Sequence, residues 1–189
     1  MSDIIIEDLL GEDESGGVVD LEKRRIVIND EIGASIVEKA IIPLIDMDSD
    51  ESGEPIEIYI NTVGGSVGDG LVLCNIIDNL KTPTTIIALG YAYSMGAIIL
   101  AAGKHNPNVK KVCYKFSSAL IHDGYTTLEG GSGNVADTYE FIQSMERKIR
   151  QYLIDNTNIP AEQYEVMERK ECYMDANAML AAGLVDEII

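Results

Sequence analysis

Ser94 combines a potentially reactive side chain with a setting that could activate it. Residues 85–89 form a β-branched, apolar run that predicts a buried strand ending at Gly90, and residues 97–102 predict an apolar helix that begins just after Ser94. The hydroxyl would then lie at a strand-to-helix corner, where the unpaired N–H groups of a helix N-terminus stabilise an alkoxide or oxyanion. The ordinary interpretation is an N-cap, which is a common role of serine at a helix start.

A glycine-rich loop precedes this corner in the chain. Residues 56–61 predict a short strand, residues 62–70 contain four glycines, and residues 71–80 predict an apolar helix. Paired glycines allow positive φ angles, so a backbone N–H of this loop could point at a developing oxyanion. The loop lacks the Gly-Lys-Ser/Thr of a P-loop and the glycine spacing of a dinucleotide site. Its ordinary interpretation is a tight turn between a strand and a helix.

His122 is the candidate general base, because it follows the apolar Ala-Leu-Ile of residues 119–121. A lone histidine in such a place is more often a structural residue than a catalyst. The other histidine, His105, lies in a polar stretch rich in turn residues, and we expect it on the surface.

Composition limits the partners and the compartment. The 189 residues carry a net charge of −18 and a pI near 4.3, which argue against nucleic acid and anionic membranes as partners. No apolar run reaches the roughly 18 residues of a membrane helix, and we expect no signal peptide. Cys74, Cys113 and Cys172 lack metal-ligand spacing and are interpreted as free thiols in a reducing compartment. We therefore expect a cytoplasmic protein without a metal or cofactor.

The remaining pattern predicts one α/β domain. Strands alternate with helices, which implies a mostly parallel sheet, and a chain of this length can bury a substantial core. Residues 1–20 are acidic and glycine-rich, and they are expected to be flexible. The longest expected helix covers residues 136–153. Further strands are expected at residues 25–28, 111–114, 118–121 and 185–189, further helices at 33–45, after Pro160 and at 177–182, and an acidic loop at 46–54.

Several motifs, in this order, resemble those of the Clp protease proteolytic subunit. In that family a strand ending in Tyr-Ile-Asn-Ser-Pro-Gly-Gly-Ser-Val precedes a nucleophile in Ala-Ser-Met-Gly-Ala and a histidine in Met-Ile-His-Gln-Pro. The corresponding stretches here are Tyr59-Ile-Asn-Thr-Val-Gly-Gly-Ser-Val67, Tyr93-Ser-Met-Gly-Ala97 and Leu120-Ile-His-Asp-Gly124. Glu171-Cys-Tyr-Met-Asp-Ala176 and Gly183-Leu-Val-Asp186 resemble the family's C-terminal acid, aromatic, Met-Ser-Ala and Gly-Leu-Val-Asp. The resemblance runs from about residue 24 to the end.

This resemblance implies a serine peptidase site. Ser94 would be the nucleophile and His122 the base that takes its proton. The family's aspartate corresponds to Glu171, whose carboxylate would orient the imidazole. Asp175 is the second choice for this acid, because it matches the serine that follows the family's methionine.

The resemblance also implies an oxyanion hole, a fold and an assembly. The N–H groups of Gly65 and Met95 would bind the oxyanion. Residues 21–189 would form the spiral of βαβ units that Clp proteases share with crotonases, with a projecting strand–helix handle at about 125–155. Handles of this kind stack two rings, expected here to be homo-oligomeric and heptameric, and residues 1–20 would lie near the axial entrance.

Some positions depart from the family pattern. Val63 replaces the proline of the glycine-rich loop, and Asp123-Gly124 replaces the Gln-Pro after the histidine. Glu57 and Asn79 occupy positions where family members have aromatics that grip an unfoldase, which argues against docking of a standard AAA+ unfoldase. Such departures suit a divergent or phage-encoded member.

The resemblance thus predicts a serine endopeptidase that cleaves unfolded polypeptides, through an acyl-enzyme, inside a closed oligomeric chamber. One alternative is a crotonase-like acyl-CoA enzyme, although this acidic chain lacks basic residues for the CoA phosphates. The other is a catalytically silent ring subunit, which the Glu171 and His122-Asp123 departures keep open. The α/β-hydrolase fold is excluded, because its triad order is Ser, acid, His and its motif has glycine where this chain has Ala92.

Overall fold

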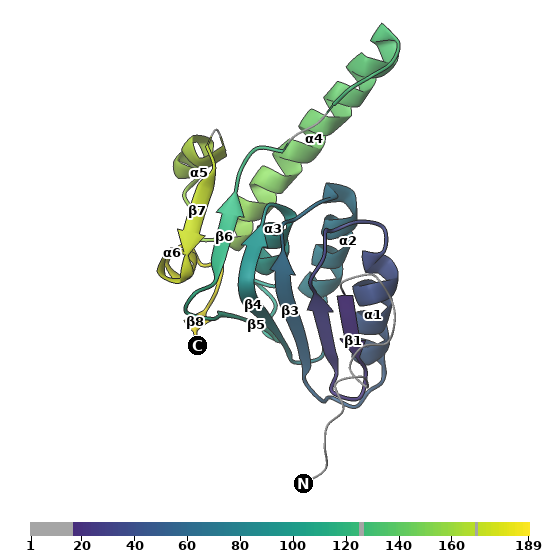
Figure 1. Ribbon diagram of the computed structural model, residues 1–189, viewed down its shortest axis with the longest axis vertical. Helices are drawn as coiled ribbons and strands as arrows, with labels where there is room; N and C mark the ends of the chain where they lie inside the picture. Colours follow the sequence, from purple (N-terminus) through teal and green to yellow (C-terminus); the bar gives the residue numbers. More distant parts are fainter. Residues whose placement is uncertain (1–16, 125–126, 169) are drawn as a thin grey trace.

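The computed structural model describes residues 17–124, 127–168 and 170–189, which form one mixed sheet with helices packed on it (Figure 1). In this part of the chain the sheet has eight strands, in the order β1-β2-β3-β4-β5-β8, while β6 pairs with β4 and β7. The strands are β1 (Gly17–Asp20), β2 (Arg25–Ile28), β3 (Ile56–Thr62), β4 (Thr84–Tyr93), β5 (Val109–Cys113), β6 (Ser118–Ile121), β7 (Cys172–Asp175) and β8 (Glu187–Ile188). The helices are η2 (Val37–Ile41), α1 (Ile42–Ser49), α2 (Val67–Asp78), α3 (Met95–Ala101), α4 (Ser132–Asn156), α5 (Ala161–Glu168) and α6 (Ala176–Ala181).

The expected α/β class with a mostly parallel sheet is confirmed. Pairs β2–β3, β3–β4, β4–β5, β4–β6 and β5–β8 are parallel, whereas β1–β2 and β6–β7 are antiparallel. Alternate side chains of β3 are buried, so one face of this strand contributes Ile56, Ile58 and Ile60 to the core. Helices α2 and α3 pack against each other and bury Leu73 and Ile99 completely.

The expected end of a strand at Gly90 is wrong, because β4 continues to Tyr93. The first part of β4 pairs with β5, and its last three residues pair with β6. The register with β3 shifts between Ile60 and Thr62, and there the side chain of Asn61 accepts a hydrogen bond from the N–H of Tyr91 (3.2 Å). A Cβ at position 90 would lie 2.8 Å from Asn61 Oδ1, so glycine permits this contact. Gly90 therefore marks a change of strand partner.

The helix expected at 33–45 begins later and extends further. It is a π-helical turn, η2, followed by α1, which ends at Ser49 inside the expected acidic loop. Four apolar side chains of this segment, spaced three to four residues apart or adjacent, are buried: Ile36, Ala40, Ile41 and Leu44. Within α1, Asp48 Oδ1 accepts hydrogen bonds from the N–H groups of Lys81 (2.9 Å) and Thr82 (2.8 Å), so this acidic side chain ties the helix to the segment before β4.

Other boundaries also differ from those expected. Helix α2 begins at Val67, before position 71, because the Ser66 hydroxyl accepts a hydrogen bond from the Asp69 N–H as an N-cap. Strands β1 and β7 were not expected, since four residues carry little periodicity. The last strand is shorter than expected. Next to it, the buried ammonium of Lys111 donates to the carbonyl of Gly183 (3.1 Å), which fixes the C-terminal segment.

The long helix projects away from the sheet. Helix α4 covers 25 residues, more than the 18 expected, and its N-terminal half extends beyond the other elements (Figure 1). Its C-terminal half is attached to the core, where Leu153 is buried and the Tyr152 hydroxyl donates to Asp78 Oδ2 (2.8 Å). Residues 127–131 before it are not a strand. Most of the expected N-terminal segment and part of the expected handle strand, residues 1–16 and 125–126, lie outside the described residues.

Candidate active site

Ser94 occupies the corner between β4 and α3 in an unusual backbone conformation. Its φ and ψ angles are 53° and −119°, a region that costs residues other than glycine of the order of 1–3 kcal/mol. The N–H of Ser94 donates to the carbonyl of Leu120 (2.8 Å), and α3 behind it is buried from Met95 to Ala101. Although Ser94 is the N-cap residue, its side chain makes no capping hydrogen bond. The ordinary interpretation of this hydroxyl as a cap is therefore wrong.

The glycine-rich loop packs directly on this corner. A Cβ at Gly64 would lie 2.6 Å from Ser94 Cβ and 2.9 Å from the Met95 nitrogen, so only glycine permits the approach. The loop is anchored by Ile32, whose N–H donates to the Gly64 carbonyl and whose carbonyl accepts from the Ser66 N–H, both at 2.7 Å. Gly64 and Gly65 have φ angles of 102° and 141°. The tight-turn interpretation holds, and the turn also contacts the candidate nucleophile.

The two backbone donors expected for an oxyanion are at this corner or next to it. Met95 is the first residue of α3, so its N–H has no partner within the helix. Gly65 directly follows the glycine that contacts Ser94, and among the described residues its N–H makes no hydrogen bond. Both groups remain candidates for binding a developing negative charge.

Ser94 and His122 line one cavity. His122 directly follows β6, and it is half-buried. The cavity has a volume of about 610 Å³, and its wall comes from the start of α2, the corner at Ser94, residues 122–124 and one face of α4. His105, in contrast, is exposed as expected, and its Nε2 lies 3.0 Å from the carbonyl oxygen of Asp155.

Strand pairing separates the two candidate acids. Antiparallel pairing of β6 and β7 places Ile121 opposite Cys172 and Ser118 opposite Asp175. His122 directly follows and Glu171 directly precedes the pair of Ile121 and Cys172, so both residues lie at the same end of the β6–β7 ladder. Asp175 lies at the other end of β7, where its Oδ1 accepts from the Ala178 N–H (2.8 Å) as the N-cap of α6. The carboxylate of Asp175 therefore has a structural role, and Glu171 lies closer to the histidine.

A cluster of tyrosines, not anticipated from the sequence, lies beside Glu171. The Tyr173 hydroxyl donates to Glu171 Oε2 (3.3 Å), and the nearby carboxylate raises the pKa of Tyr173. The ring of Tyr93 packs edge-on against that of Tyr173, with centroids 5.9 Å apart, and Tyr91 packs on Tyr93. Tyr93 and Ser118 share a hydrogen bond of 2.9 Å between their hydroxyls. Tyr91 and Tyr93 are two residues apart on one strand, so their side chains lie on the same face of the sheet. This spacing is the feature of the sequence from which part of the cluster could be predicted.

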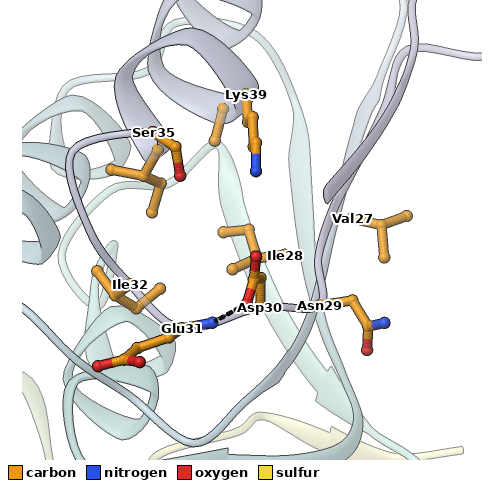
Figure 2. A pocket seen from close by; sticks show the side chains of 10 residues that line it. Val27, Ile28, Asn29, Asp30, Glu31, Ile32, Ser35 and Lys39 are labelled. Atoms are coloured by element: carbon orange, nitrogen blue, oxygen red, sulfur yellow. Dashed lines mark hydrogen bonds between the residues drawn. The ribbon is translucent and has the colours of Figure 1, made fainter. Parts of the chain in front are cut away.

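The cavity wall does not include every residue expected in the active site. Gly65, Glu171 and Asp175 are not part of its wall. Among the described residues, no hydrogen bond links the side chains of Ser94, His122 and Glu171. A second, much smaller cavity of about 20 Å³ lies between residues 27–32 and the start of the following helix, next to Ile32 and Lys39 (Figure 2). It has room for about one water molecule, so it is too small for a substrate.

The two positions expected to affect docking of an unfoldase carry polar interactions. Glu57 accepts hydrogen bonds from Arg25 Nη2 (2.8 Å) and from the Tyr59 hydroxyl (3.0 Å). The Arg25 guanidinium also lies over the Tyr59 ring, 5.2 Å from its centroid. Asn79 is the C-cap of α2, and its side chain donates to the Asn75 carbonyl (2.8 Å). An ion pair thus stands at one of these positions and an amide at the other.

Comparison with known proteins identifies the family. The model of the Clp protease family matches residues 18–189, nearly the whole chain. The chain belongs to the Clp protease family. One relative is the ATP-dependent Clp protease proteolytic subunit 2 of Bacillus licheniformis, 27% identical over 169 residues, which cover 89% of this chain and 87% of that protein. The expected resemblance is confirmed, and membership of the Clp protease family supports a peptidase function.

Two further features bear on what this Clp protease family member can bind. Within the described ranges, no helix is long and apolar enough to cross a membrane. In the same ranges, no group of three or more histidine, cysteine or acidic side chains could hold a metal ion. The three cysteines are free, with Cys74 and Cys113 buried, and burial raises the pKa of the Cys74 thiol to about 12.

Proposed function

We propose that this protein is a serine endopeptidase that cleaves unfolded polypeptides inside a homo-oligomeric chamber. The observation that carries the proposal is the geometry of Ser94. Its hydroxyl caps nothing, its backbone is held in a strained conformation at the start of a buried helix, and it shares a cavity with His122. Strain of this kind is typical of a nucleophile presented at a sharp turn between a strand and a helix.

The mechanism follows from the placement of these groups. Ser94 Oγ attacks the scissile carbonyl while His122 accepts its proton and then passes it to the leaving amine. The N–H groups of Gly65 and Met95 stabilise the oxyanion of each tetrahedral intermediate. His122 then takes a proton from a water molecule that attacks the acyl carbonyl, and it returns this proton to Ser94 Oγ as the acyl-enzyme bond breaks. Glu171, at the same end of the β6–β7 ladder as His122, orients the imidazole and stabilises its charged form.

Assembly into two stacked rings of identical subunits, expected to be heptameric, is part of the proposal. Helix α4 projects from the domain and exposes Tyr139 and Phe141, whose apolar surface a second subunit would cover (Figure 1). The chamber would be cytoplasmic. The Arg25–Glu57 ion pair and Asn79 replace an aromatic docking surface, so we infer that a standard AAA+ unfoldase docks poorly.

The assembly is tested by placing charge on the projecting helix. Replacing Tyr139 by aspartate should reduce the assembly to single rings or smaller species and abolish activity, because Tyr139 is exposed outside the cavity wall and buried unpaired charge at a subunit contact is strongly disfavoured. Sedimentation velocity measures the effect, with the exposed pair Glu140→Gln and Lys148→Gln as a control for charge changes on the same helix. An unchanged large species would refute stacking through α4.

A catalytically silent ring subunit is the second candidate. It is favoured by the absence, among the described residues, of a hydrogen bond between the side chains of Ser94 and His122, and by the binding of Glu171 to Tyr173. The two candidates differ in whether the isolated assembly turns over substrate.

Hydrolysis of unfolded casein and of short fluorogenic peptides tests the proposed function. Ser94→Ala should abolish both activities and leave the assembly intact, because alanine is small and compatible with a helix start. The matched control is Ser144→Ala, on α4 outside the cavity wall, which should retain activity. Hydrolysis by Ser94→Ala at the native rate would show that another group is the nucleophile, and an inactive native assembly would favour the silent subunit.

A further inference from the structure

The wall of the cavity formed by α4 is apolar except for one carboxylate. Ile142, Met145 and Ile149 contribute to this wall, and Glu146 lies among them. Glu146 is four residues after Ile142 and three before Ile149, so all three side chains share one face of the helix. The carboxylate therefore stands within an otherwise hydrophobic strip that faces the cavity containing Ser94.

Glu146 has no cationic partner among the described residues. The natural partner on a helix would be Arg150, four residues on, but Arg150 Nη2 donates to Glu165 Oε1 (2.6 Å). No hydrogen bond or ion pair of the described residues reaches the Glu146 carboxylate. The cavity wall contains a second carboxylate, Asp123, and neither lysine nor arginine. A cation entering this cavity would thus meet two acids, and the only basic group of the wall among the described residues is the His122 imidazole.

We propose that this cavity binds the side chain on the acyl side of the cleaved bond and selects lysine or arginine there through Glu146. The inference rests on the proposed peptidase function. The strip from Ile142 to Ile149 is about 10 Å long at the helical rise of 1.5 Å per residue, which suits a long side chain. Lysine and arginine place an aliphatic stem on apolar surface while their charged ends reach a polar group, and Glu146 supplies that group. The net charge of −18 favours the approach of basic peptides.

Three fluorogenic peptides that differ at this one residue test the proposal on the full-length assembly. They carry lysine, norleucine or glutamate, and norleucine keeps the stem of lysine but lacks its ammonium group. The native protein should prefer lysine to norleucine about fivefold in kcat/KM, the upper range for a solvent-exposed ion pair, and should cleave the glutamate peptide most slowly. Sodium chloride at high concentration should reduce the lysine preference, because salt screens an exposed pair.

Variants of α4 identify the responsible side chain. Glu146→Gln should cleave the lysine and norleucine peptides at equal rates. Glu146→Lys should reverse the preference in favour of glutamate. Glu140→Gln removes the same charge from the same helix outside the cavity wall, so it should keep the native lysine preference.

The outcomes separate this proposal from the one on which it depends. Equal native rates on lysine and norleucine, or a lysine preference that survives in Glu146→Gln, would overturn the role of Glu146 and leave the peptidase intact. If Glu146→Gln loses all activity, the salt dependence of the native preference decides, and a preference unchanged by salt overturns the proposal. No cleavage by the native protein, or the same cleavage by Ser94→Ala, would overturn the proposed function itself.

Discussion

The corner that holds Ser94 and the strand end that holds Glu171 are built in different ways. Ser94 lies between β4 and the fully buried α3, with its N–H bound to Leu120 and Gly64 packed against its side chain. Glu171 is exposed just before β7, and the hydrogen bond that holds its carboxylate comes from Tyr173, itself 59% exposed. The core of one subunit thus fixes the candidate nucleophile, whereas surface contacts position the candidate acid.

The largest effect expected from this comparison concerns the choice of acid. Glu171→Gln should lower kcat by about 10⁴, by analogy with replacing a triad aspartate by its amide. Asp175→Asn should leave kcat nearly unchanged, because its carboxylate caps α6 on the far end of β7. Steady-state kinetics of the two variants side by side measures the difference. The opposite ranking would transfer the role of acid to Asp175.

Removal of the Asp175 cap provides the complementary control. Asp175→Ala should lower the free energy of unfolding by about 1 kcal/mol, the usual cost of losing an N-cap. Thermal denaturation of this variant and of Glu171→Ala should therefore show destabilisation only for Asp175. A larger loss of stability for Glu171→Ala would mean that Glu171 has a structural role.

The corner is expected to be intolerant of one added methyl group. Gly64→Ala would place a Cβ 2.6 Å from that of Ser94, at a positive φ that alanine disfavours, so the corner must shift. We expect a loss of about 1–3 kcal/mol in unfolding free energy and of roughly a hundredfold in kcat, since small displacements at a catalytic centre are costly. Gly68→Ala, at a glycine with open space around its Cβ position, is the matched control for stability. Native kinetics in Gly64→Ala would show that the contact does not position Ser94.

The smallest expected effect on kcat comes from removing the hydrogen bond between Tyr173 and Glu171. Tyr173→Phe removes the hydroxyl that donates to Glu171 and keeps the ring that packs on Tyr93. We expect kcat to fall a few-fold with KM unchanged, because an exposed hydrogen bond contributes about 1 kcal/mol. Tyr91→Phe changes a neighbouring tyrosine that does not contact Glu171, so its kcat should be native. A fall in kcat no larger for Tyr173→Phe than for Tyr91→Phe would show that the hydrogen bond is not used in catalysis.

The sequence predicts the buried corner better than the exposed strand end. Apolar runs and glycines identify β4, α3 and the loop at Gly64, because core packing leaves a strong pattern of residue types. The continuation of β4 past Gly90 depends on Asn61, a neighbour distant in sequence, and no local pattern reports it. Similarly, β7 has four residues, and only its pairing with β6 brings Glu171 and His122 to the same end of the sheet. The tyrosine cluster forms only when β4 and β7 approach each other from positions 80 residues apart.

Covalent labelling by a fluorophosphonate, followed by intact-mass analysis and peptide mapping, tests most directly whether Ser94 is an activated nucleophile. The native assembly should gain one label per subunit at Ser94, and Ser94→Ala should gain none. His122→Ala should label far more slowly, because the proton of the hydroxyl then lacks its acceptor. His105→Ala, at the exposed histidine, should label at the native rate. A native assembly that stays unlabelled, or a label mapped to another residue, would contradict the assignment of Ser94.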